Sequence, residues 1–170
     1  EIAKISLNGE DEAAKNTTKS ILVYVLDASL KMLHPFMPFV TEEIWQHIPH
    51  EGDSIVTSEF AKIDASLVFE KETEDMQFIQ DVITAVRNIR SEVNAPMSRE
   101  IPIKIKYSQD SVKDVLLSGS AYLEKFARPS ELIIEREVEA NETDISRILP
   151  GAEIYVSLSD LIDVDKEKER

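Results

Sequence analysis

The sequence predicts an α+β fold, in which a helical bundle is followed by a small α/β subdomain with a three- or four-stranded sheet. Apolar residues recur at three- and four-residue steps up to Pro96, which is the spacing of one face of an α-helix. After Pro96 the pattern changes to alternation over residues 101–107, which is typical of a half-buried strand. We therefore expect a helical domain over residues 1–96 and an α/β subdomain over residues 97–160.

The first helical region is predicted to contain a long helix that ends in a sharp corner. Most positions from Ile21 to Leu33 are apolar, more than a helix with one buried face requires, so we expect this helix to pack on several sides. Pro35 ends it near His34, because a proline disfavours helical geometry in the residue before it. Pro38 suits the first turn of the next helix, where its missing N–H leaves no hydrogen bond unmade.

The second helix is expected to bury an apolar stripe that closes at Pro49. The stripe consists of residues at four-residue steps beside the single tryptophan: Val40, Ile44, Ile48 and Trp45. Phe36 and Phe39 lie at the corner itself, and large aromatic residues at such a position are more often core than contact residues. After Pro49, a polar segment over residues 50–71 is expected to cross the surface, with a short extended piece at 54–57.

A long helix with one apolar face is predicted from about Thr73 to the region of Pro96. Its apolar residues are Met76, Ile79, Val82, Ile83, Val86, Ile89 and Val93. Two short helices should follow the first strand, separated at Ser118-Gly119-Ser120. Further strands are expected at 131–135, between Val138 and Leu149, and after the Pro150-Gly151 turn, where Ile154, Val156 and Leu158 alternate with polar neighbours.

The composition limits the possible functions. The chain carries 33 acidic and 19 basic residues, a formal net charge of -14, which argues against a freestanding nucleic-acid binder, because phosphate binding depends on lysine and arginine. Cysteine is absent, which removes disulfides and thiolate metal sites and fits a cytosolic protein. The apolar run 21–33 is interrupted by Asp27, Ser29 and Lys31, so no membrane span is expected.

No catalytic constellation is apparent in the sequence. It contains no glycine-rich phosphate loop and no nucleophile elbow, and His34, His47 and His50 are too loosely arranged to bind a metal. We therefore expect no catalytic residue, no metal and no cofactor in this chain.

The run from His34 to Trp45 (His-Pro-Phe-Met-Pro-Phe-Val-Thr-Glu-Glu-Ile-Trp) resembles the signature corner of the anticodon-binding domain in class I aminoacyl-tRNA synthetases of the valine, leucine and isoleucine group. The His34-Pro35 pair is most similar to the valyl family, as are the runs 37–39 and 41–43. The resemblance implies a parent that ligates valine to tRNA(Val) using ATP, with its catalytic and editing domains outside this chain, so these residues should be inactive alone.

The same resemblance implies further properties. The partner would be tRNA(Val), with no DNA and no membrane, and the parent would be a cytoplasmic monomer. Residues 161–170 would begin a C-terminal coiled coil. The nearer alternative is a leucyl or isoleucyl relative, and the alternative from another class is an acidic helical module that binds proteins and no RNA, which the net charge of -14 favours.

Three residues near the end of the long helix are candidate tRNA contacts. Arg87, Arg90 and Asn94 lie at i, i+3 and i+7 along one border of the apolar stripe, where guanidinium groups can reach phosphates or base edges. The resemblance supports this assignment, because the run 89–94 followed by a proline is similar to a valyl-family motif. The alternative is that these arginines form ion pairs with acids such as Glu42 or Glu43 and hold helices together.

Overall fold

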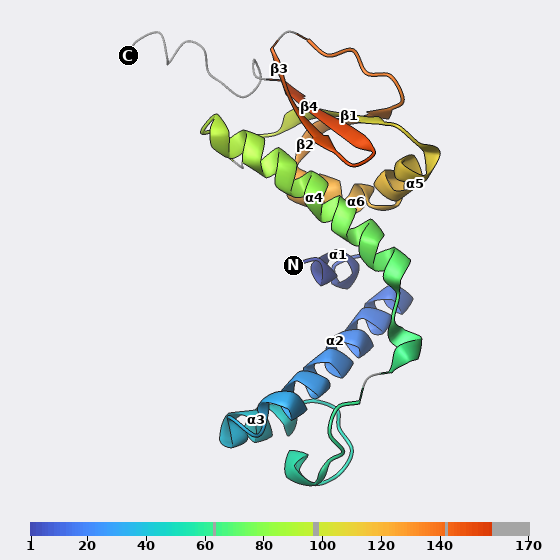
Figure 1. The fold of residues 1–170 in the computed structure, drawn as a ribbon. Coiled ribbons are helices and arrows are strands. Elements are labelled where there is room, and N and C mark those ends of the chain that lie inside the picture. The colour runs from blue at the N-terminus through green and yellow to red at the C-terminus, as the bar shows by residue number, and fades with distance from the viewer. Residues whose placement is uncertain (63, 97–98, 142, 158–170) are drawn as a thin grey trace. The chain divides into compact units, whose positions relative to one another are not determined.

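The computed structural model describes residues 1–62, 64–96, 99–141 and 143–157, and the chain divides into two compact units, Glu1–Val68 and Phe69–Arg170 (Figure 1). The predicted fold class is confirmed. Helices make up the first unit, and the second combines helices with a four-stranded sheet.

The first unit contains three α-helices and two short 3-10 helices among its described residues. They are α1 (Ala3–Leu7), α2 (Glu12–Leu33), α3 (Pro38–Trp45), η1 (Ile55–Thr57) and η2 (Ala65–Leu67). The Asp11 side chain caps α2 by accepting hydrogen bonds from the main-chain N–H groups of Ala13 and Ala14, which satisfies donors that have no partner within the helix. The predicted corner is present: His34 caps the end of α2 and Pro38 occupies the first turn of α3.

The core of the first unit is small and differs from the predicted one. It consists of Leu30, Trp45 and Ile55, with Ile48 packed against them. The expectation that the apolar-rich helix packs on several sides is wrong, since Leu30 is the one fully buried residue of α2. The exposed apolar residues of α2 are Ile21, Leu22, Tyr24, Val25, Leu26, Met32 and Leu33.

The predicted stripe of α3 is also rotated. Thr41 and Trp45 are the buried residues of this helix, whereas Val40 is 57% exposed and Ile44 is 41% exposed. Residues four apart share a face of a helix, so turning α3 to bury Trp45 carries Thr41 inward and leaves the neighbouring apolar row outside.

The extended piece expected at residues 54–57 is a 3-10 helix instead. The Ser54 hydroxyl accepts a hydrogen bond from the main-chain N–H of Val56, and the described residues of the first unit include no strand with which an extended segment could pair. Local side-chain capping therefore outweighs the β-propensity of Ile55, Val56 and Thr57.

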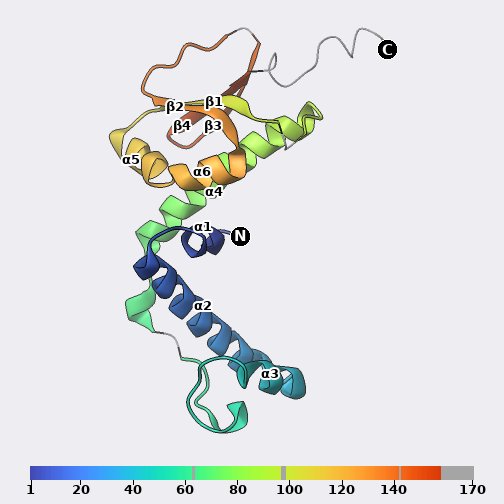
Figure 2. The ribbon, with the colours of Figure 1, turned by 180° about the vertical axis from the view of Figure 1, so that it is seen from behind.

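The second unit is a four-stranded sheet with its helices on one face (Figures 1 and 2). Its elements are α4 (Glu70–Glu92), β1 (Ile101–Tyr107), α5 (Asp110–Ser118), α6 (Ser120–Ala127), β2 (Pro129–Glu135), β3 (Asp144–Leu149) and β4 (Ala152–Ser157). The strand order is β2-β1-β4-β3, with β1 and β2 parallel and the other neighbours antiparallel. The predicted break at Gly119 separates α5 from α6.

The inner face of the sheet and the apolar face of α4 form one large core. Alternate residues of β1 are buried, namely Ile101, Ile103, Ile105 and Tyr107, together with Ile154 and Val156 of β4 and the apolar stripe of α4. The long predicted helix therefore packs on the sheet and lies in the second compact unit, so the structure divides the chain between Val68 and Phe69, before α4, whereas the sequence suggested a boundary after residue 96. Leu158 and residues 161–170 lie outside the described residues.

Candidate nucleic-acid interface

Arg90 lies in the last turn of α4 and is almost fully buried, with 1% of its surface exposed. Its guanidinium donates hydrogen bonds to four main-chain carbonyl oxygens. Nη1 bonds to those of Arg99 at 2.6 Å and Pro96 at 3.3 Å, and Nη2 bonds to those of Ala127 at 2.9 Å and Arg128 at 3.2 Å. Burial lowers the pKa of Arg90, and the nearby positive charge of Arg128 lowers it further. Arg90 thus holds the segment after α4 against the end of α6.

The hydrogen-bond partners of Arg90 fit neither of the two roles predicted from the sequence, a tRNA contact or an ion pair with an acidic side chain. They are neutral carbonyl groups, whereas the ion-pair alternative required a carboxylate. The carboxylate of Glu42 instead accepts hydrogen bonds from Gln46, from the Ser54 hydroxyl and from the main-chain N–H of Ile55. With 1% of its surface exposed, Arg90 offers RNA no accessible donor, so its position is that of a residue that supports its neighbours.

Asn94 follows the C-terminal end of α4 in the left-handed conformation, with φ of 53°. The N–H of Asn94 donates to the carbonyl of Ser91 and the N–H of Ala95 donates to that of Arg90, which is the hydrogen-bond pattern of a Schellman motif. Asparagine is one of the few residues other than glycine that adopt this conformation readily. The side chain of Asn94 is exposed and remains available to a ligand.

Arg87 is exposed on α4, one turn before Arg90. Its guanidinium carbon lies 5.9 Å from the centre of the Phe126 ring, which is within the range of a cation–π interaction. Among the described residues Arg87 forms no ion pair. The contact with Phe126 leaves the N–H groups of Arg87 able to donate.

Arg128 is a basic residue at this site that the sequence analysis did not identify. It caps the C-terminal end of α6 with φ of 51°, and its side chain is exposed. A signal was present in the sequence, since Arg128 directly precedes Pro129 at the end of an apolar-periodic segment. Its proximity to the end of α4 depends on the packing of α6, which the sequence pattern does not specify.

The helical corner of the first unit exposes two aromatic residues that the sequence analysis assigned to the core. Phe36 is 82% exposed and Phe39 is 89% exposed. The corner itself is well ordered by hydrogen bonds: His34 Nδ1 lies 2.8 Å from the Thr41 hydroxyl, and that hydroxyl donates to the carbonyl of Met37 at 2.8 Å. The prediction of core burial for these two phenylalanines is therefore wrong within this chain, because Phe36 lies in the turn before α3 and Phe39 lies on the exposed side of α3.

Trp45 joins α3 to α2 through a polar contact beneath the corner. Its Nε1–H donates to Asp27 Oδ1 at 2.7 Å, and Lys31 pairs with the same carboxylate at 2.8 Å. The His50 ring lies against the indole, with ring centres 3.8 Å apart. Partial burial raises the pKa of Asp27, but the hydrogen bonds from Lys31 and Trp45 outweigh this effect, so its pKa lies below the ordinary value.

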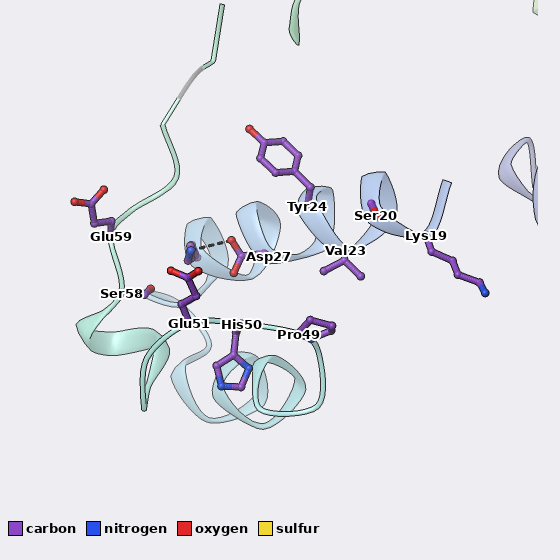
Figure 3. A pocket seen from close by; sticks show the side chains of 11 residues that line it. Lys19, Ser20, Val23, Tyr24, Asp27, Pro49, His50, Glu51, Ser58 and Glu59 are labelled. Atoms are coloured by element: carbon purple, nitrogen blue, oxygen red, sulfur yellow. Dashed lines mark hydrogen bonds and ion pairs between the residues drawn. The ribbon is translucent and has the colours of Figure 1, made fainter. Parts of the chain in front are cut away.

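An open cavity of about 890 Å³ lies beside this contact, between α2 and the segments 49–51 and 58–59 (Figure 3). Its walls carry charges of both signs, with Lys19, Asp27 and Lys31 on α2 and Glu51 and Glu59 opposite. A wall of mixed charge gives no preference for a phosphate. The cavity therefore shows no complementarity to a particular ligand.

The described residues contain no group of three or more His, Cys, Asp or Glu side chains positioned to hold a metal ion. None of their helices is both long enough and apolar enough to cross a membrane. The charged features of interest are thus the arginines around the ends of α4 and α6.

Comparison with known families identifies the class of domain. A family model described as the anticodon-binding domain of tRNA ligase matches residues 1–105, and the chain belongs to this family. The resemblance seen in the run from His34 to Trp45 is thereby confirmed.

Individual relatives add the amino-acid specificity of the proteins that the chain resembles. The chain is similar to a valine–tRNA ligase of Bacillus cereus (strain ATCC 10987), with 48% identity over 170 residues, which is 100% of this chain and 19% of the relative. A valine–tRNA ligase of Geobacillus stearothermophilus is 46% identical over 170 residues, with the same coverage of both chains. One of Staphylococcus carnosus is 46% identical over 167 residues, 98% of this chain and 19% of the relative. The chain thus spans about a fifth of the length of these relatives.

Proposed function

We propose that this chain is the anticodon-recognition portion of a valine–tRNA ligase, whose whole protein joins valine to tRNA(Val) using ATP. The observation that carries the proposal is identity of 46% to 48% with valine–tRNA ligases along the entire chain. Membership in the anticodon-binding family supports the same role. The relatives described here are valine enzymes, which favours the valyl family over its leucyl and isoleucyl alternatives.

The chemistry would belong to the rest of the ligase. ATP and valine would bind in its catalytic domain, because these 170 residues contain no phosphate-binding loop. We expect the chain alone to be inactive in aminoacylation. The whole protein would act in the cytoplasm as a monomer, with tRNA as its nucleic-acid partner and no DNA.

We further propose that the helical anticodon-binding domain extends through residue 96, although α4 is packed in the second compact unit. The family match over residues 1–105 includes α4 and supports this extent. Residues 97–160 would be the small α/β subdomain, and residues 161–170 would begin a C-terminal coiled coil.

Of the candidate contact residues, we propose that Arg87 and Asn94 meet tRNA while Arg90 positions them. Arg87 and Asn94 are exposed. The forked guanidinium of Arg87 suits a phosphate or a base edge. Arg90 is buried against four carbonyl groups and fixes the backbone on which Asn94 lies.

Binding of the purified chain to tRNA transcripts tests the proposal. The chain should bind tRNA(Val) at low salt more tightly than tRNA(Ile) or tRNA(Leu), and binding should weaken as salt rises, since phosphate contacts release counterions. The affinity should be modest, because a net charge of -14 allows few such contacts. Absence of binding, or equal binding of all three transcripts, would contradict the proposal.

An acidic protein-interaction module is the second candidate, and one observation favours it. The corner of the first unit exposes Phe36 and Phe39, and large exposed apolar groups are typical of protein-binding surfaces. Phe36→Ser and Phe39→Ser separate the two functions. Unchanged tRNA binding in both variants, together with loss of a protein partner, would favour the module, whereas selective binding of tRNA(Val) by the unmodified chain favours the ligase.

A further inference from the structure

Arg128 occupies a backbone conformation that its residue type does not favour. It caps the end of α6 with φ of 51° and ψ of 59°, the left-handed region in which the Cβ of an ordinary residue is crowded. Helices commonly end in this conformation, but usually with glycine or asparagine. Asn94 meets that preference at the end of α4, and Arg128 does not. The local fold therefore gives no reason for an arginine at this position.

The positive charge of Arg128 is also electrostatically unfavourable where it lies. Its main-chain carbonyl accepts a hydrogen bond from the buried guanidinium of Arg90, and the positive charges of the two side chains repel each other. Within the described residues neither Arg87 nor Arg128 forms an ion pair. Glu124 and Glu131 are close in sequence but pair with neither arginine. Although the chain has 33 acidic residues, none of those that the structure describes neutralises this positively charged site.

The packing of α4 against α6 places Arg87 and Arg90 beside the last residues of α6 and its C-cap. Arg87 of α4 lies over the ring of Phe126, two residues before Arg128, and Arg90 of the same α4 face bonds to the carbonyls of Ala127 and Arg128. A guanidinium held near an aromatic ring keeps N–H groups that can donate, and arginine can fork onto a phosphate.

We propose that Arg87 and Arg128 together bind a backbone phosphate of RNA, with Arg90 as the positioning residue that fixes the Arg128 main chain. We call Arg87 and Arg128 the phosphate clamp. The clamp rests on the proposed tRNA-binding function and adds the C-terminal end of α6 to the tRNA-binding surface. An anion bound at Arg128 would offset the repulsion between Arg128 and Arg90, which accounts for an arginine where glycine would be easier to accommodate.

The sharpest test is Arg128→Gly, because glycine suits the left-handed conformation and removes the charge without disturbing the fold. The melting temperature should stay the same or rise. For the complex with a tRNA(Val) transcript, the slope of log K against log salt should decrease by about one unit. Arg87→Ala should give a similar decrease, and the double variant should lose little more than either single variant, because both arginines would serve one phosphate.

Arg136→Ala is the matched control. It removes the same charge from the same unit, but Arg136 is exposed and paired with Asp110 at 3.2 Å. The control should leave the salt slope nearly unchanged. If Arg128→Gly and Arg136→Ala change the slope equally, or if Arg128→Gly changes nothing while the unmodified chain binds tRNA(Val), the clamp is wrong and the proposed function stands. If the unmodified chain binds no tRNA at all, both are wrong.

Discussion

The two units of this chain use similar apolar helical patterns and bury them to very different extents. Among the described residues, three apolar residues form the buried cluster of the first unit, whereas sixteen do so in the second. The apolar face of α4 is covered by the sheet, but most apolar residues of α2 remain exposed. A helical period of apolar residues thus predicts that a helix forms and that one of its faces is suited to burial. The period does not predict whether the element that buries this face lies in the same unit. Burial drives folding in proportion to area, so the second unit should be the more stable.

The largest expected effect is that of Arg90→Met on the second unit. Methionine fills part of the volume but leaves four carbonyl groups without their donor. Unsatisfied buried groups of this kind should lower the free energy of unfolding by about 3 kcal/mol or more. Trp45 is the single tryptophan and lies in the first unit, so its fluorescence reports that unit separately, and circular dichroism reports both.

For Arg90→Met, we expect the main circular dichroism transition to move to lower denaturant while the fluorescence transition stays in place. Arg87→Met, which changes an exposed arginine on the same helix, should move neither by a comparable amount. A shift of the fluorescence transition alone would mean that Arg90 stabilises the first unit instead of the second, contrary to its hydrogen bonds.

A smaller effect is expected at the junction of α5 and α6. A Cβ on Gly119 would lie 2.4 Å from Cδ1 and 2.6 Å from Cγ1 of Ile79 on α4. Gly119→Ala should therefore force α6 or Ile79 to shift and destabilise the second unit by about 1 to 3 kcal/mol. Gly9→Ala is the control in the first unit, because its Cβ would meet nothing closer than 3.4 Å. A denaturation midpoint of the second unit that is the same in Gly119→Ala as in the unmodified chain would contradict the packing of Gly119 against Ile79.

The first unit should be sensitive to acid through Asp27. Its pKa lies below the ordinary value in the folded state because of the bonds from Lys31 and Trp45, so the folded state binds fewer protons than the unfolded state. The resulting stability is present above the ordinary pKa of 3.8 and is lost as the pH falls through the lower folded value. Fluorescence-detected unfolding at pH 6 and pH 3 measures it.

Asp27→Asn isolates this contribution from that of other carboxylates. The variant should be less stable than the unmodified chain at pH 6, by about 1 kcal/mol for the lost charged hydrogen bonds. The difference between the two proteins should shrink toward pH 3. A difference that stays constant with pH would mean that Asp27 remains protonated or that its partners contribute nothing.

The smallest effect is expected for Phe39→Ser. Because the side chain is 89% exposed, its removal should change the free energy of unfolding by less than about 0.5 kcal/mol. Trp45→Ser, which removes a buried residue of the same helix, should abolish the part of the circular dichroism transition that belongs to the first unit. A large loss of stability in Phe39→Ser would show that the corner is packed in solution.

Several elements could be predicted because their signals are local. Pro35 and Pro38 determine the corner through their own backbone geometry, and alternation from Ile101 to Tyr107 determines a strand with one buried face. Gly119 separates two short helices, as the small residues around it indicated. These features depend on neighbours in sequence.

The features that escaped prediction depend on tertiary packing. The partners of Arg90 are main-chain carbonyls up to 38 residues away, and no side-chain pattern specifies a carbonyl. Arg128 becomes part of the site because α6 packs on α4. The rotation of α3 was missed because Val40-Ile44 and Thr41-Trp45 are adjacent rows of one helix, and a single tryptophan decides which row turns inward.

The most direct test of the central claim, that this chain recognises an anticodon, is a competition measurement between two tRNA(Val) transcripts that differ only in the anticodon. At low salt, replacing the anticodon bases should weaken binding to the purified chain by about 1 to 3 kcal/mol per lost base contact, while the salt slope stays the same because the phosphates are unchanged. Equal affinity for the two transcripts would contradict the account.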